Sequence, residues 1–360
     1  QERTRSQHEA TTVCLVTLAE ARANAPRLTH ENPPRPEFLG VRTVSTAPDA
    51  PSSRAIGWAD LISMIDWSPF FHVWELRGRF PAILQHAKHG EQARQLYADA
   101  QRVLERIAAG DRLIARGVYG FFPANSVGDD VELYRDADRS EVLARFHFLR
   151  QQIVKDDASP HRCLADFVAP RPAAGPGGAA EHLGLFAVTS GLGLDEWVKS
   201  FKAEHDDYHA ILAEALADRL AEAFAEYLHR RVRAEWGYGR DERLSVEQLI
   251  DEEYRGIRPA PGYPACPDHS ETRTLWTLLD VENRTGIRLT ESGAMWPGSS
   301  VSGLYFAHPD AKYFVVGKLG RDQVVDYAGR KRVPVTEVER WLRPYLAYEP
   351  EVSAAAPKQS

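Results

Sequence analysis

The residues with the clearest chemical potential lie in one proline-rich segment, residues 256–269, with the sequence GIRPAPGYPACPDH. Its single arginine, Arg258, has a planar guanidinium group that can bind a carboxylate through two parallel hydrogen bonds. The four prolines fix φ and remove N–H donors, which leaves carbonyl oxygens free to accept, and Gly262 lets the backbone approach a ligand closely. This pattern suits an amino-acid-like ligand that carries an adenine. The alternative is a rigid connection between two helices.

Two histidines, His205 and His209, have the i, i+4 spacing with which a helix can present two imidazoles to one metal ion. No glutamate follows the first histidine directly, and no third ligand follows the second, so we interpret them as surface residues and predict no metal site. The overlapping stretch 207–212 approaches the pattern D-x-H-x-x-G, by which some proteins supply a histidine to cobalt. Leu212 replaces the glycine and the segment is predicted to be helical, so we do not expect cobalt ligation here.

Glycines in residues 188–196, VTSGLGLDE, lie between a predicted strand and a predicted helix, as in nucleotide-binding turns. The third glycine of that fingerprint is missing, and so is the acidic residue about twenty positions further on. We interpret the stretch as an ordinary strand-to-helix turn.

Three carboxylates, Asp218, Glu222 and Glu226, are spaced one turn apart on a predicted helix. Spacing alone favours a solvated face over a functional one.

The surrounding pattern predicts both helices and antiparallel strands. Amphipathic helices are expected over residues 91–109 and 207–236, a hairpin over 116–136 and a buried strand over 184–191. Strands in hairpins, without a repeating strand–helix–strand alternation, favour an α+β fold with an antiparallel sheet over a doubly wound fold.

Smaller elements are also expected. Capping boxes at Ser245 with Gln248 and at Asp268 with Glu271 predict helices before and after the proline-rich segment. Two further strands are expected on either side of residues 308–310, followed by two short helices near the C-terminus.

Composition restricts the partners. The formal net charge of −7 argues against nucleic acid, and no run approaches the ~18 apolar residues of a membrane helix. The polar start, residues 1–10, is not a secretory signal, and without an initiator methionine it suggests a fragment or a processed chain. Three scattered cysteines, Cys14, Cys163 and Cys266, indicate a reducing, cytoplasmic setting.

Eight co-linear blocks resemble the C-terminal activation domain of cobalamin-dependent methionine synthase. Together they span about residues 57 to 349. The blocks are IDWSPFFHVWEL (65–76), GFFPANSVGDDVELYRD (120–136), LRQQ (149–152), CLADFVAP (163–170), EHDDYHAILAEALADRLAEAFAEYLH (204–229), GIRPAPGYPACPDH (256–269), ESGAMWPGSSVSGLYFAHPDAKYF (291–314) and VTEVERWL (335–342).

The resemblance implies a function that composition does not show. Such a domain binds S-adenosylmethionine beside the cobalamin-binding module of the same polypeptide. When the cofactor is oxidised to inactive cob(II)alamin, an electron from flavodoxin or a flavoprotein reductase and the methyl group of S-adenosylmethionine restore methylcobalamin. The implied fold is a twisted antiparallel sheet flanked by helices, not a Rossmann fold.

The resemblance also implies binding residues. Arg258 matches the arginine of an R-x-x-x-G-Y motif that is expected to bind the ligand carboxylate, and Tyr263 completes that motif. Ala260 and Gly262 would offer backbone contacts to the adenosine. Asp66 matches an aspartate expected on the ligand ammonium group.

Further positions match on the other sides of the ligand. Tyr313 and Phe314 correspond to an aromatic pair at the ligand, and Glu252 to an acidic residue near the sulfonium. Asp218 and Glu222 match acidic positions that face the cobalamin. No side chain is expected to act as a catalytic acid or base, so a pure binding module is one alternative, and a free-standing methyltransferase with its own acceptor is another.

The resemblance divides the chain into three parts. Residues 1–56 are expected to be the end of the preceding cobalamin module with its linker, residues 57–349 the activation domain, and residues 350–360 a disordered tail. Zinc would belong only to upstream modules outside this sequence. The chain alone is therefore not expected to make methionine.

Overall fold

An antiparallel sheet of six strands organises the chain in the computed structural model, which describes residues 13–110, 112–172 and 180–350. The strand order is β4-β3-β2-β5-β8, and β1 pairs with the first half of β2. The strands are β1 (Gly40–Ser45), β2 (Ile114–Val127), β3 (Asp130–Tyr134), β4 (Val142–His147), β5 (His182–Leu192) and β8 (Ser300–Tyr305), with a separate small pair, β6 (Arg288–Leu289) and β7 (Met295–Trp296). Every pairing is antiparallel, so the predicted α+β class is confirmed.

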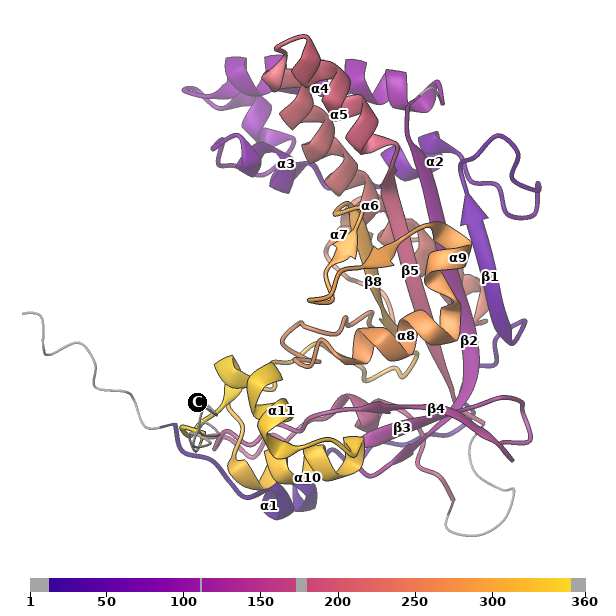
Figure 1. Cartoon of the computed structure of the whole chain (residues 1–360), viewed down its shortest axis with the longest axis vertical. Helices are drawn as coiled ribbons and strands as arrows, with labels where there is room; N and C mark the ends of the chain where they lie inside the picture. Colours follow the sequence, from indigo (N-terminus) through magenta and orange to yellow (C-terminus); the bar gives the residue numbers. More distant parts are fainter. Residues whose placement is uncertain (1–12, 111, 173–179, 351–360) are drawn as a thin grey trace, which may run out of the picture.

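Helices cover the sheet and both of its ends (Figure 1). Helices α3, α4 and α5 lie at one end, whereas α1, α10 and α11 lie at the other, beside β3 and β4. The helices are α1 (Leu18–Ala23), α2 (Trp58–Ile62), α3 (Trp67–Val73), η1 (Ala82–Gln85), α4 (Gly90–Ala108), η2 (Leu164–Phe167), α5 (Leu194–Ala203), α6 (Asp207–Glu235), α7 (Val246–Ile250), α8 (Glu271–Leu279), α9 (Val281–Thr285), α10 (Arg321–Lys331), α11 (Val335–Trp341) and η3 (Arg343–Tyr345).

The long helix α6 forms where the amphipathic pattern predicts it. Asp206 caps its first turn by accepting a hydrogen bond from the backbone N–H of His209 at 3.1 Å. Its apolar stripe is fully buried against β5, β8 and helices α2 to α5. Close packing needs glycine on the sheet, because a β-carbon at Gly117 would lie 2.9 Å from the ring of Phe224.

The N-terminal segment packs on the rest of the chain. Strand β1 pairs with β2, and Arg22 of α1 bridges Asp129 and Asp326, each at 2.8 Å. The predicted division at residue 56 stays a prediction. Residues 351–360 of the predicted tail lie outside the described residues.

Two of the smaller expectations are wrong. Only one strand, β8, flanks residues 308–310, because residues 312–318 run without strand pairing and cross over to the proline-rich loop. Asp268 does not cap α8 in a box with Glu271. Both carboxylates instead pair with Lys331 of α10, which joins α8 to the C-terminal end. The capping box of Ser245 and Gln248 is confirmed.

Candidate ligand-binding site

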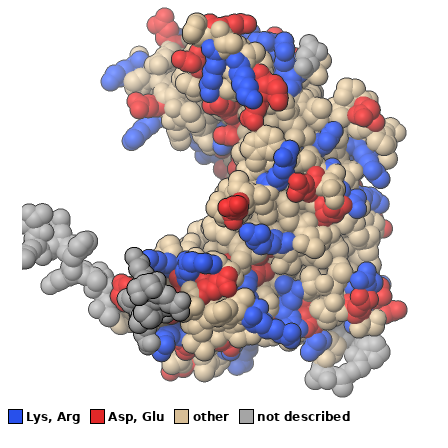
Figure 2. All heavy atoms as spheres, in the orientation of Figure 1, with Lys and Arg blue, Asp and Glu red and all other residues tan. Residues whose placement is uncertain are grey.

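A cavity of about 660 Å³ opens beside the proline-rich loop, where β8, α6 and the segment after residue 312 meet. The elements around it lie at the middle of the concave face that Figure 2 shows between the two helical ends. Its walls are mostly apolar with a few charged groups, which is typical of a small-molecule site. The lining residues are Phe186, Glu222, Glu252, Arg258, Pro259, Ala260, Pro261, Tyr263, Pro264, Ala265, His269, Thr272, Gly293, Ala294, Met295, Ser300, Val301, Ser302, Tyr313, Phe314 and Val315.

The loop is fixed to its neighbours on both sides. Ile257 exchanges two backbone hydrogen bonds with Phe306, and the carbonyls of Pro259 and Pro264 accept from the N–H groups of Leu304 and Val316, both at 2.9 Å. Some of the carbonyls that the prolines were expected to leave free therefore hold the loop in place. The result is a cavity wall whose ordering costs little when a ligand binds.

The guanidinium of Arg258 is held by one of its three nitrogens. Nη1 pairs with Oε2 of Glu226 at 2.7 Å, donates to the hydroxyl of Tyr254 at 2.7 Å and approaches Nδ1 of His229 at 3.3 Å. Within the part of the chain that the structure describes, neither Nε nor Nη2 has a hydrogen-bond partner. These two atoms form the edge that binds a carboxylate side-on.

The electrostatic environment keeps Arg258 charged. Burial is the largest single influence and would lower the pKa of its guanidinium, but the carboxylate of Glu226 and the surrounding tyrosine hydroxyls together outweigh burial, so the pKa lies above its ordinary value. Only 18% of the Arg258 side chain is exposed. A charge this buried is worth more to an incoming carboxylate than a surface arginine would be.

Most of the predicted ligand residues meet at the cavity. Tyr313 lines it and accepts a hydrogen bond from the backbone N–H of Arg258 at 3.1 Å, while Phe314 and Ala260 form apolar wall. Tyr263 also lines the cavity, with 63% of its surface exposed.

The acidic residues divide into two groups. Glu252 and Glu222 line the cavity, and burial raises the pKa of Glu252 above its ordinary value. Asp218 lies one turn before Glu222 on α6, outside the cavity lining, and accepts a hydrogen bond from the hydroxyl of Ser299 at 2.6 Å.

Two of the residues predicted to bind the ligand, Asp66 and Gly262, also lie outside the cavity lining. Asp66 is the N-cap of α3, where its carboxylate accepts the N–H of Ser68 at 3.0 Å. Gly262 lies in the loop behind the lining, with a φ of +90° that favours glycine, and its N–H donates to the carbonyl of Cys266 at 2.7 Å.

Sequence reasoning did not single out two side chains at or beside the cavity, Glu226 and His269. Glu226 was noticed only as one of three carboxylates on a helical stripe, a pattern that does not distinguish a buried ion pair from a solvated face. His269 lines the cavity, and no sequence pattern distinguished it from any other polar loop residue.

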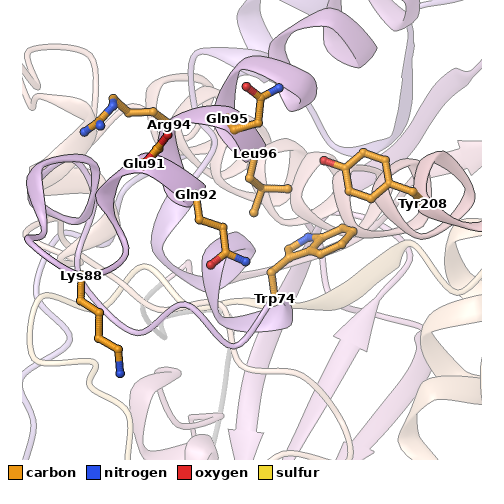
Figure 3. Close-up of a pocket in the computed structure, with 8 residues that line it drawn as sticks. All are labelled: Trp74, Lys88, Glu91, Gln92, Arg94, Gln95, Leu96 and Tyr208. Atoms are coloured by element: carbon orange, nitrogen blue, oxygen red, sulfur yellow. The ribbon is translucent and has the colours of Figure 1, made fainter.

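A second cavity, of about 910 Å³, lies between α3, α4 and the start of α6 (Figure 3). It is lined by Trp74, Tyr208 and Leu96 together with Lys88 and polar side chains of α4, and it holds none of the predicted ligand residues. Among the described residues, no group of three or more His, Cys, Asp or Glu side chains could hold a metal ion. None of the described helices is long and apolar enough to cross a membrane.

Comparison with known proteins gives matches to a protein family and to solved structures. Residues 58–332 match the family model of the activation domain of vitamin B12-dependent methionine synthase. The chain is also similar to a crystal structure of the MetH reactivation domain bound to AdoHcy, with 51% sequence identity and a TM-score of 0.87. That match covers 93% of this chain and 99% of the other.

Proposed function

The chain belongs to the family of vitamin B12-dependent methionine synthase activation domains, and from this we propose that it binds S-adenosylmethionine and supports reductive methylation of inactive cob(II)alamin to methylcobalamin. The observation that supports the proposal most directly is the cavity with a free edge of Arg258 inside it. The solved relative was crystallised with AdoHcy, the product that S-adenosylmethionine leaves when it gives up its methyl group.

The charges of the cavity match those of the ligand. S-adenosylmethionine has one carboxylate, one ammonium and one sulfonium. Arg258 would bind the carboxylate, and Glu252 and Glu222 would stabilise the positive end. The ammonium contact of Asp66 stays a prediction, because its carboxylate caps α3 and does not line the cavity.

The loop and the aromatic residues would hold the adenosine. Ala260, Tyr313 and Phe314 line the same cavity, so a flat base placed there would have both polar and apolar contacts. The contact of Gly262 with the adenosine stays a prediction, because Gly262 lies outside the lining. Methyl transfer to a cobalt centre needs positioning of donor and acceptor more than acid–base chemistry. This is consistent with our assignment of no catalytic acid or base.

The partners follow from the family. We infer that the cobalamin module of the same polypeptide docks against the concave face and approaches Asp218 and Glu222, and that flavodoxin or a flavoprotein reductase supplies one electron. Cobalamin supplies the methyl acceptor and is held by its own module. Zinc would belong to modules outside this sequence, and the buried thiols Cys163 and Cys266 are consistent with a cytoplasmic location.

Calorimetry on the purified chain tests the first step of this proposal. We expect S-adenosylmethionine and S-adenosylhomocysteine to bind with one-to-one stoichiometry, and adenosine alone to bind more weakly because it lacks the carboxylate. Absence of heat with both ligands in a folded protein would refute the proposed function.

A further inference from the structure

We propose that Glu226 is a positioning residue: with Tyr254 and His229 it fixes the guanidinium of Arg258 so that Nε and Nη2 face the cavity and select ligands that have a carboxylate. The inference rests on the proposed function for the ligand but assigns a role to a group outside the cavity lining. Glu226 would not touch the ligand. It would act through Arg258.

The first argument is the distribution of contacts. All three side chains that hold the guanidinium approach the same atom, Nη1, at 2.7, 2.7 and 3.3 Å. A guanidinium is planar and rigid, so fixing one nitrogen from three directions also fixes the plane in which the other two lie. The contacts thus restrain the orientation of the free edge without using it.

The second argument is that Arg258 has another carboxylate nearby with which it could pair, that of Glu252. Glu252 lines the same cavity, and Arg258 lies close enough to act on its pKa. An arginine side chain has many rotamers, so an unrestrained Arg258 would sample other orientations. The ion pair with Glu226, whose side chain is only 7% exposed, opposes such a turn.

The third argument is the state of His229. Arginine can only donate, so Nδ1 of His229 must accept and the proton must lie on Nε2. The ring is stacked on Tyr305 at a centroid distance of 4.9 Å and an interplanar angle of 15°, which holds Nδ1 toward Arg258. Burial, with Arg233 and Arg258 nearby, lowers the pKa of His229 and keeps the ring neutral.

A matched pair of ligands separates positioning from a general loss of structure. S-adenosylmethionine and decarboxylated S-adenosylmethionine differ only in the carboxylate that Arg258 would bind. We expect Glu226→Ala to weaken binding of the first by about tenfold and to leave binding of the second within about twofold of wild type. Glu214→Ala, an exposed glutamate on the same helix, is the control and should change neither affinity.

Two conservative variants extend the test. Glu226→Gln keeps the size of the side chain but removes the charge of the ion pair, so it should weaken binding of the carboxylate ligand alone, and less than Glu226→Ala does. Tyr254→Phe removes one hydroxyl from Nη1 and keeps the ring, so it should cause a smaller loss for that ligand alone. Because both changes keep nearly the full volume of the side chain, both keep the test valid if Glu226→Ala unfolds.

The outcomes are distinct. Equal weakening of both ligands in the Glu226 and Tyr254 variants would show a purely structural role and overturn the inference. Unchanged binding of both ligands would overturn it as well. Failure of the wild-type chain to bind either ligand would instead refute the proposed function.

Discussion

The imidazole of His269 lies directly over the α-carbon of Gly262, so that a β-carbon at Gly262 would be 2.0 Å from Cε1 of the ring. Both residues belong to the proline-rich loop, and the ring of His269 lines the cavity. The absence of a side chain at residue 262 therefore sets the position of an imidazole at the ligand site. A turn with a φ of +90° and a cavity wall depend on the same glycine.

Gly262→Ala is expected to weaken S-adenosylmethionine binding by more than about tenfold, because the β-carbon displaces His269 and the left-handed backbone is strained. Gly40→Ala is the matched control, since Gly40 has a φ of +88° and nothing within 4 Å of its β-carbon position. The control should lose stability but not affinity. Calorimetry and thermal unfolding of both variants measure the two effects, and normal affinity in folded Gly262→Ala would contradict the account.

Arg258→Lys should weaken S-adenosylmethionine binding by about tenfold or more although it keeps the charge, because lysine cannot make two parallel hydrogen bonds. Arg79→Lys, at an exposed ion pair with Asp251, is the comparison and should bind normally. Titration calorimetry gives both affinities. An unchanged affinity in Arg258→Lys would remove Arg258 from the ligand site.

Glu252 should make binding of the positively charged sulfonium depend on pH. Burial raises the pKa of Glu252, so its stabilisation of a cation is complete above that pKa and is lost as the pH falls through it. S-adenosylhomocysteine lacks the positive charge on sulfur. We therefore expect the ratio of the affinity for S-adenosylmethionine to the affinity for S-adenosylhomocysteine to fall as the pH is lowered from neutral through the raised pKa of Glu252.

Glu252→Gln should lower the ratio of the affinity for S-adenosylmethionine to the affinity for S-adenosylhomocysteine at neutral pH, and it should flatten the pH dependence of that ratio. Glu253→Gln, at the neighbouring exposed carboxylate, should leave both unchanged. If this affinity ratio had the same pH dependence in wild type and in Glu252→Gln, a group other than Glu252 would be responsible for the preference for the sulfonium.

Asp218→Asn is expected to leave S-adenosylmethionine binding intact, because Asp218 lies outside the cavity lining and an asparagine can still accept from Ser299. In the full polypeptide the same change should slow reductive reactivation, since we place Asp218 at the cobalamin module. Normal reactivation kinetics would remove Asp218 from that interface.

Periodicity and motif resemblance predicted much of this architecture. The apolar stripe of α6 and the two strands of the β2–β3 hairpin, separated by a turn-rich stretch, have strong local patterns, so their type and approximate position could be predicted. Strand β1 could not, because its six residues lie among prolines and serines and depend on pairing with β2. Asp268 likewise has the local pattern of a helix cap, but its carboxylate pairs with Lys331, which lies sixty-three residues further along the chain.

Residues of the site could be predicted where a sequence motif specifies them. They could not be predicted where tertiary contacts determine which side chains are buried and paired. Arg258 and Tyr313 follow from matched positions along the chain and meet at the cavity. Glu226 has the same helical spacing as Asp218 and Glu222, and only the fold makes it buried and paired. Asp66 matched a motif, yet in this structure its carboxylate caps a helix.

The most direct test of the central claim follows the methyl group itself. The chain is mixed with S-adenosylmethionine that is radiolabelled on its methyl group, with a separately purified cobalamin module in the cob(II)alamin state and with reduced flavodoxin. We predict label on cobalamin, dependent on both the chain and the reductant, and no labelled methionine when homocysteine is offered to the chain alone. Labelled methionine from the chain alone, or no label on cobalamin despite tight S-adenosylmethionine binding, would contradict the account.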